Sequence, residues 1–109
     1  MNKIQLYILN YIAYDKEPLH LLISACLSDN ICKTPYEIIK PLVDLLCEGF
    51  IESYHHSGFS GEPYKAVDLR EEELFSYINK NIKSGFESYP EDEGEYFFHT
   101  SERGFRFVT

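Results

Sequence analysis

The chain has no tryptophan, one methionine and few basic side chains. Its 109 residues contain 10 lysines and arginines against 18 aspartates and glutamates, which gives a formal net charge of −8. Domains that bind nucleic acids usually carry the opposite sign. The shortage of basic residues therefore argues against a generally basic surface. A nucleic acid could still be bound by a local basic stripe on an otherwise acidic domain.

Cysteines and long apolar runs are also scarce. The three cysteines are odd in number and lie in apolar helical patterns, which is typical of buried thiols in a reducing compartment; they are Cys26, Cys32 and Cys47. Residues 1–18 contain an apolar stretch of only about ten residues, which fits neither a secretion signal nor a membrane span. We therefore expect a cytoplasmic protein that does not enter a membrane.

Aromatic residues, by contrast, are abundant. The chain has nine tyrosines and eight phenylalanines, and 44% of its residues are hydrophobic. This composition lies outside the disordered class, and the length suffices for one hydrophobic core but not for two. We predict a single domain over 1–109.

Hydrophobic periodicity predicts four helices. They span 2–14, 18–28, 35–48 and 71–84. The third has the clearest start, because Thr34 and Glu37 have the spacing of a capping box around Pro35. Pro41 lies inside this helix and lacks an amide hydrogen, so we predict a kink or a tightened turn between Glu37 and Pro41.

Strand patterns follow the third helix. Runs over 50–56 and 64–69 flank the loop SGFSGEP, whose glycines and proline predict a hairpin connection. Two further runs near the end bracket SERG. The alternation of apolar and polar residues after SERG favours a second hairpin, with strands over 95–100 and 104–108, and a strand followed by a helical turn is the alternative.

The segment TPYEIIKPLVDLLCEGFIES carries a resemblance to the winged helix-turn-helix superfamily. Its third helix ends in Leu-Leu-x-x-Gly, followed by a hydrophobic pair and a strand; the matching residues are Leu45, Leu46, Gly49, Phe50 and Ile51. The run EYFFHTSERG is similar to the strand and the threonine-to-glycine step near the end of many such domains, with Thr100 and Gly104 in the matching places. The likeness covers residues 2–69, with a weaker echo over 96–108.

The resemblance implies an α+β fold: a winged helix with a three-helix core and a β-hairpin wing, extended by the fourth helix and a C-terminal strand or hairpin. Winged-helix domains commonly bind DNA through the third helix and the wing, whereas others bind proteins or dimerise. On this chain the candidate DNA contacts are Lys33, Tyr36, Lys40, His55, Lys65 and Arg70. However, residues 34–52 contain one lysine against four carboxylates, and carboxylates that face phosphates weaken binding.

Acidic and aromatic residues are interleaved from Glu87 to Glu95, and the next lysine or arginine along the chain is Arg103. Acidic side chains attract a basic partner while tyrosines supply contact area, as in a small inhibitor or immunity protein or a regulatory adaptor. We therefore predict a non-catalytic, acidic module that binds another, basic protein through Tyr89, Glu91, Asp92, Glu93, Glu95 and Tyr96. The alternative is a DNA-binding transcriptional regulator using 34–48 and 50–69, which would form a homodimer through the first and fourth helices.

No arrangement of residues in the sequence points to catalysis or to a bound cofactor. The cysteines lack the Cys-x-x-Cys spacing of zinc sites, and their apolar surroundings would raise the thiol pKa and reduce reactivity. The loop SGFSGEP lacks the lysine and helix start of a phosphate-binding loop. We expect no enzymatic activity, no metal and no cofactor.

Overall fold

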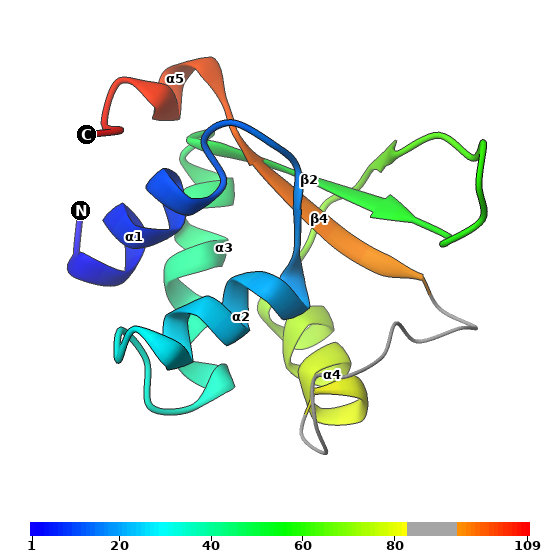
Figure 1. Cartoon of the computed structure of the whole chain (residues 1–109), viewed down its shortest axis with the longest axis horizontal. Coiled ribbons are helices and arrows are strands. Elements are labelled where there is room, and N and C mark those ends of the chain that lie inside the picture. The colour runs from blue at the N-terminus through cyan, green and yellow to red at the C-terminus, as the bar shows by residue number, and fades with distance from the viewer. Residues whose placement is uncertain (83–93) are drawn as a thin grey trace.

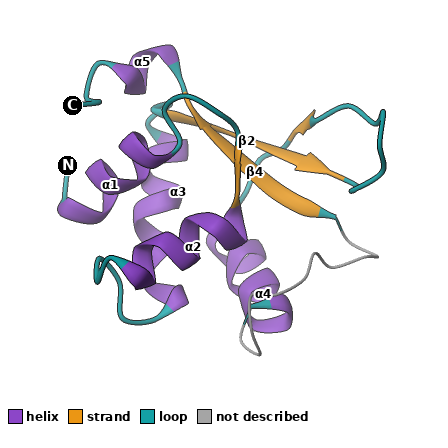
Figure 2. Cartoon of the chain, in the orientation of Figure 1, coloured by secondary structure: helices purple, strands orange, loops and turns teal. Residues whose placement is uncertain are grey.

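The computed structural model describes residues 1–82 and 94–109, and this part of the chain confirms the predicted α+β class (Figures 1 and 2). It contains helices and a sheet of four antiparallel strands. In chain order the elements are α1 (Lys3–Tyr11), β1 (Glu17–Pro18), α2 (Leu19–Ser28), the 3-10 helix η1 (Pro35–Ile38), α3 (Ile39–Cys47), β2 (Ile51–His56), β3 (Lys65–Ala66), α4 (Glu71–Asn81), β4 (Glu95–Thr100) and α5 (Glu102–Phe105).

Local hydrogen bonds explain where the third helix begins and why it changes pitch. The Glu37 carboxylate accepts hydrogen bonds from the backbone amides of Thr34 and Lys33, each at 2.6 Å. These bonds, led by the one from Thr34, lower the pKa of Glu37. The first turn is the tighter η1, and α3 starts at Ile39, so Pro41 lies in the first turn of α3, where an amide hydrogen needs no partner within the helix. The predicted tightened turn is confirmed.

The sheet has the order β1-β4-β2-β3, so β4 lies between two other strands. Strand β2 pairs along its whole length with β4, from Ile51 opposite Thr100 to His56 opposite Glu95. The contact between β2 and β3 is limited to two residue pairs, Tyr54 with Ala66 and His55 with Lys65. The main antiparallel partner of β2 is therefore a strand some forty positions further along the chain, and β3 is a short edge strand.

Two predicted strands differ from the structure. The strand predicted over 104–108 is wrong, because residues 102–105 form α5. Both edges of β4 are already paired, which leaves no place for a hairpin partner. In addition, the Ser101 hydroxyl accepts a hydrogen bond from the Gly104 amide at 3.1 Å and caps the helical turn. The strand predicted over 64–69 is reduced to Lys65–Ala66, and the chain then turns inward at the buried Leu69.

The core lies between the helices α1, α2 and α3 and the inner face of the sheet. Phe98 of β4 is fully buried among aliphatic side chains of these helices, including Ile8, Leu22 and Leu42. Helix α4 packs against η1 and α3, and Figure 1 shows it on the other side of α3 from α1. The two helices through which the alternative homodimer was predicted to form thus lie on opposite sides of α3.

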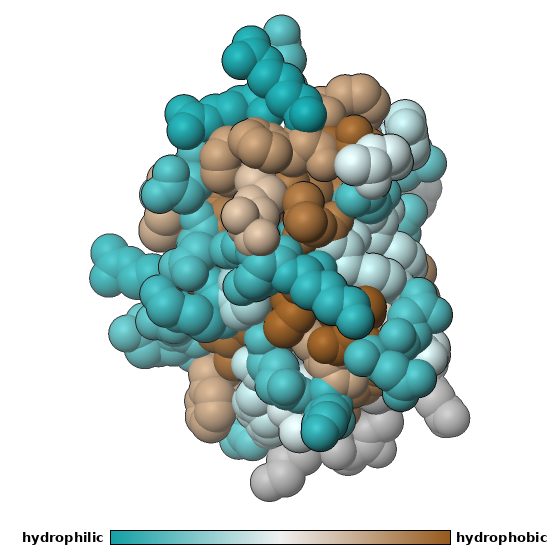
Figure 3. All heavy atoms as spheres, turned by 90° about the vertical axis from the view of Figure 1, so that its left-hand side faces the viewer, coloured by the Kyte–Doolittle hydropathy of each residue, from teal (hydrophilic) through white to brown (hydrophobic). Residues whose placement is uncertain are grey.

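The face that carries α1, α5 and both ends of the chain displays hydrophobic side chains between polar ones (Figure 3). None of the helices in residues 1–82 and 94–109 has the length and apolar character that a membrane span requires.

Candidate interaction surface around helix α3

The outward side of α3 carries an ion pair in place of a free basic side chain. Lys40 and Asp44 are one helical turn apart, and the Lys40 ammonium lies 2.9 Å from the Asp44 carboxylate. The hydrogen bond to Asp44 is the main cause of a raised pKa for Lys40, and the carboxylate of Glu71 on α4 adds to it. Lys40, the one basic residue of the predicted DNA-reading helix, therefore already lies among carboxylates.

Helix α4 covers the start of the third helix. The Tyr36 hydroxyl donates a hydrogen bond to the side-chain oxygen of Asn79 at 3.0 Å, and the ring centroids of Tyr36 and Phe75 are 5.2 Å apart. Tyr36 was a predicted DNA contact, and in the structure it contacts α4. The first turn of α4 carries three exposed carboxylates, from Glu71 to Glu73, which the partial positive charge at a helix N-terminus stabilises.

A shallow groove continues this surface beyond the C-terminal end of α3. It has a volume of about 480 Å³ and lies between α3, β2 and the segment 66–70. Its ionisable residues are Cys47, Glu52, Tyr54, Asp68 and Arg70. The acidic α3–α4 surface is defined as the groove together with the adjoining α3 and α4 carboxylates, that is, Asp44, Glu52, Asp68 and Glu71, and the basic residues in it are Lys40 and Arg70.

The remaining predicted DNA contacts are spread over several elements. Lys33 lies in the loop before η1, and Arg70 is the residue before α4. His55 and Lys65 face each other across β2 and β3, where His55 also contacts the Tyr96 ring edge-on at 5.4 Å between centroids. Each lysine or arginine on the α3 side thus has a carboxylate within a few positions along the chain.

Of the six residues predicted to bind a protein, the structure describes Glu95 and Tyr96. Tyr89, Glu91, Asp92 and Glu93 lie outside the described residues. Tyr96 is half-buried at the side of the sheet. Glu95 is only 1% exposed, so it does not belong to an acidic surface.

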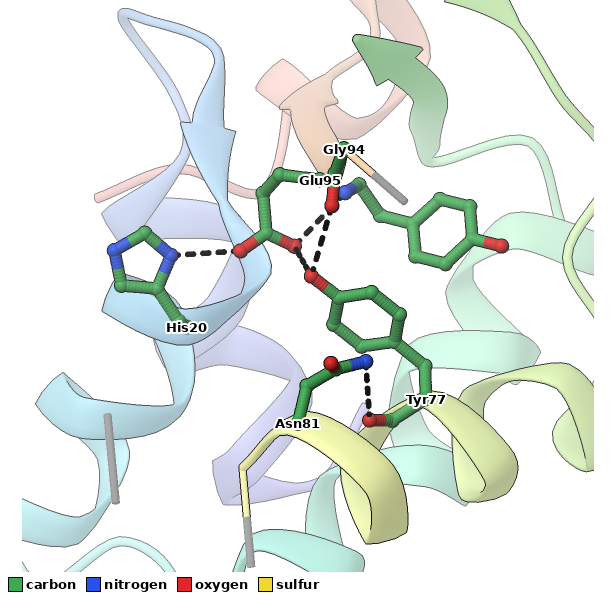
Figure 4. A network of polar contacts seen from close by, with 6 residues as sticks. His20, Tyr77, Asn81, Gly94 and Glu95 are labelled. Carbon is green, nitrogen blue, oxygen red and sulfur yellow. Dashed lines mark hydrogen bonds and ion pairs between the residues drawn. The ribbon is translucent and has the colours of Figure 1, made fainter. Parts of the chain in front are cut away.

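Glu95 is the centre of a buried polar network that joins α2, α4 and β4 (Figure 4). One carboxylate oxygen accepts hydrogen bonds from the Tyr77 hydroxyl at 2.7 Å and from the Tyr96 amide at 2.8 Å. The other lies 2.7 Å from Nδ1 of His20. The Tyr77 hydroxyl also lies 3.3 Å from the Gly94 carbonyl oxygen. The network fixes α4 to the sheet, because Tyr77 is on α4 and Glu95 begins β4.

The three thiols differ sharply in their surroundings. Burial raises the pKa of Cys26 to about 12, and burial is also the main cause of a raised pKa at the neighbouring Cys32. Cys47 is exposed at the groove. Because the thiolate is the reactive form, we expect only Cys47 to react quickly with an aromatic disulfide reagent at mildly alkaline pH.

Thiol titration measures this directly. The folded chain should release about one equivalent of chromophore quickly, and the chain in denaturant about three, since unfolding exposes Cys26 and Cys32 to water. A Cys47→Ser variant should lose the fast equivalent. Fast reaction of two or three thiols in the folded chain would contradict the burial described for Cys26 and Cys32.

Comparison with models of protein families, with curated proteins and with solved structures gives no match to this chain.

Proposed function

We propose that the chain is a winged helix whose wing carries a long insertion. In this assignment α1, α2 and the η1–α3 helix form the three-helix core, and β2 and β4 are the two strands of the wing. Residues 57–94, which include β3 and α4, are then inserted between the wing strands. The support is the full-length pairing of β2 with β4 and the pairing of β4 with β1.

The step from Thr100 to Gly104 that contributed to the resemblance has a clear packing role in this assignment. The Thr100 hydroxyl donates a hydrogen bond to the Leu9 carbonyl at 2.9 Å, and its amide donates to the Ile12 carbonyl at 3.1 Å. These bonds attach the end of β4 to the C-terminal end of α1. Gly104 then allows α5 to lie directly against the backbone of Phe50. The motif thus joins the wing, the first helix and the chain end.

We further propose that this domain is a non-catalytic, acidic module that binds a basic protein, as an inhibitor, an immunity protein or a regulatory adaptor. The observation that carries the proposal is the acidic α3–α4 surface, since it occupies the side of α3 that a DNA-binding winged helix presents to phosphates. Four carboxylates surround Lys40 and Arg70 there. Each carboxylate near a phosphate repels it, whereas a lysine- or arginine-rich protein surface is attracted by the same charges.

Helix α4 gives a second reason to favour a protein partner. A helix that enters the major groove needs its N-terminal residues free to contact base edges. Here Tyr36 is held by Asn79 and Phe75, and the α4 carboxylate of Glu71 acts on Lys40 of α3. The inserted helix therefore widens the acidic surface and at the same time obstructs the approach of a duplex to α3.

The test is the capture of a binding partner from a lysate of the source cells by the immobilised chain, with mass spectrometry of what is retained. We expect a protein with a high pI, and the Asp68→Lys/Glu71→Lys variant should bind it at least about tenfold more weakly. Asp15→Lys/Glu62→Lys is the matched control, because it makes the same charge change at exposed positions outside the acidic α3–α4 surface. Equal loss in both variants, or retention of only acidic proteins, would refute the proposal.

A further inference from the structure

A second surface of the molecule is more apolar than the acidic α3–α4 surface, carries two arginines, and adjoins that surface at Glu52. It lies over the end of α1 and over α5 with the residues that follow α5, on the face shown in Figure 3. We call it the α1–α5 surface and define it by Leu6, Tyr14, Arg103, Phe105, Arg106 and Phe107. Tyr14 is 76% exposed, and Phe105 and Phe107 are 45% and 44% exposed. Large aromatic side chains with this exposure, grouped on one face, are characteristic of interaction sites.

Contacts among neighbouring side chains hold these aromatic rings in place. Tyr14 and Phe105 meet edge to face with 5.7 Å between ring centroids, and Phe107 meets Phe50 in the same way at 5.1 Å. The amide of Thr109 donates a hydrogen bond to the side-chain oxygen of Asn10 on α1 at 3.0 Å, which ties the last residues to that helix. The exposed rings are thus presented on an ordered support, which reduces the entropy lost when a partner binds.

Two shallow hollows lie on either side of α5, and both are lined by Glu102 and Arg106. The first, of about 470 Å³, reaches from Ala13 to Phe105, and the second, of about 540 Å³, includes Arg103 and reaches Gly49 and Glu52, where it adjoins the acidic α3–α4 surface. The guanidinium of Arg103 lies over the Phe50 ring at 4.9 Å. Among the described residues, the ion pairs are His20 with Glu95 and Lys40 with Asp44. Neither Arg103 nor Arg106 therefore forms an ion pair with a carboxylate within that part of the chain.

We propose that the α1–α5 surface binds an acidic, apolar segment of a second protein. Apolar side chains of that segment would pack on Tyr14, Phe105 and Phe107, and its carboxylates would pair with Arg103 and Arg106. Tyrosine and arginine are among the residue types enriched at positions that dominate binding energy, and an arginine often pairs with a carboxylate through two parallel hydrogen bonds.

A second copy of the same chain fits this surface less well. A symmetric dimer would bring each α1–α5 surface onto its own copy, whose hollows supply as many arginines as carboxylates. An acidic segment supplies carboxylates alone and therefore complements Arg103 and Arg106 better. The inference does not depend on the partner of the acidic α3–α4 surface; where both partners bind, the domain is an adaptor that joins a basic protein to an acidic one.

The proposal is tested by selecting short random peptides displayed on phage against the full chain, and by measuring the anisotropy of the enriched peptides after labelling. We expect enriched peptides in which Asp or Glu flanks aliphatic or aromatic residues. Arg103→Glu/Arg106→Glu should weaken their binding at least about tenfold. Lys65→Glu/Lys80→Glu, which changes exposed lysines elsewhere by the same charge, should leave binding unchanged.

The Asp68→Lys/Glu71→Lys variant should also bind these peptides normally, which separates this test from that of the acidic α3–α4 surface. Three outcomes would overturn the proposal. They are enrichment of no peptide that depends on Arg103 and Arg106, enrichment of basic peptides, and a homodimer in light scattering that Phe105→Ser converts to a folded monomer.

Discussion

Replacement of Glu95 with alanine is expected to lower the free energy of unfolding by about 3–4 kcal/mol. The carboxylate is 1% exposed and accepts hydrogen bonds from the Tyr77 hydroxyl and the Tyr96 amide, with His20 at its other oxygen. Its removal withdraws this acceptor from three polar groups in the protein interior at once. Chemical denaturation followed by far-ultraviolet circular dichroism measures the loss without requiring a tryptophan, which the chain lacks.

Two companion variants test whether this loss of stability comes from the buried hydrogen bonds of Glu95. Glu95→Gln keeps an oxygen acceptor and should cost less, about 1–2 kcal/mol, because only the charge-assisted part of the network is lost. Glu52→Ala removes an exposed carboxylate from the neighbouring strand and should change stability by no more than about 0.5 kcal/mol. If Glu95→Ala were as mild as Glu52→Ala, Glu95 would be a surface residue, and its place in the acidic docking stretch would have to be restored.

Replacement of Gly104 with alanine is expected to cost about 1–3 kcal/mol or more. A Cβ at this position would overlap the backbone carbonyl oxygen of Phe50 and would approach Cγ2 of Thr100 to 3.0 Å. The first obstacle is backbone, which cannot rotate away as a side chain can. We expect α5 to be displaced from the start of β2 or the whole domain to be destabilised, and thermal unfolding measures the effect as a lower Tm.

Glu102→Ala serves as the control for the Gly104 substitution, because it introduces alanine at an exposed position of the same helical turn. It should change stability by no more than about 0.5 kcal/mol. A Gly104→Ala variant with the same Tm as the unmodified chain would show that α5 does not pack against Phe50 as described, and it would remove the packing role that the winged-helix assignment gives to Gly104.

The elements that could be predicted from the sequence are those determined by neighbouring residues. Thr34, Pro35 and Glu37 specify a helix start within four positions, and Pro41 specifies the tightened turn before α3, so both were predicted correctly. The alternation around Phe105 and Phe107 also resembled a strand. The deciding fact for that segment was that β4 already has partners on both edges, which depends on residues eighty positions away and has no local signature.

The candidate surfaces were less predictable for the same reason. The network around Glu95 joins α2, α4 and β4, and a glutamate next to an acidic stretch has no feature in the sequence that distinguishes it from a solvated one. The low ratio of basic to acidic residues in the third helix indicated that its outward side carries few free basic groups. The structure adds that α4 brings the carboxylate of Glu71 to this side. The exposure of Tyr14 and Phe107 depends on how α5 lies against α1, which periodicity alone does not give.

The central claim, that the side of α3 which would meet DNA is an acidic, protein-binding surface, is tested most directly by fluorescence anisotropy with a labelled random-sequence duplex. The titration is repeated from low to physiological salt, because binding through phosphates weakens steeply as salt rises. We predict no binding at any salt concentration in the series. Micromolar or tighter binding at low salt that weakens as salt rises, and is lost on replacing Lys40 and Lys65 with alanine, would contradict the claim and establish the DNA-binding alternative.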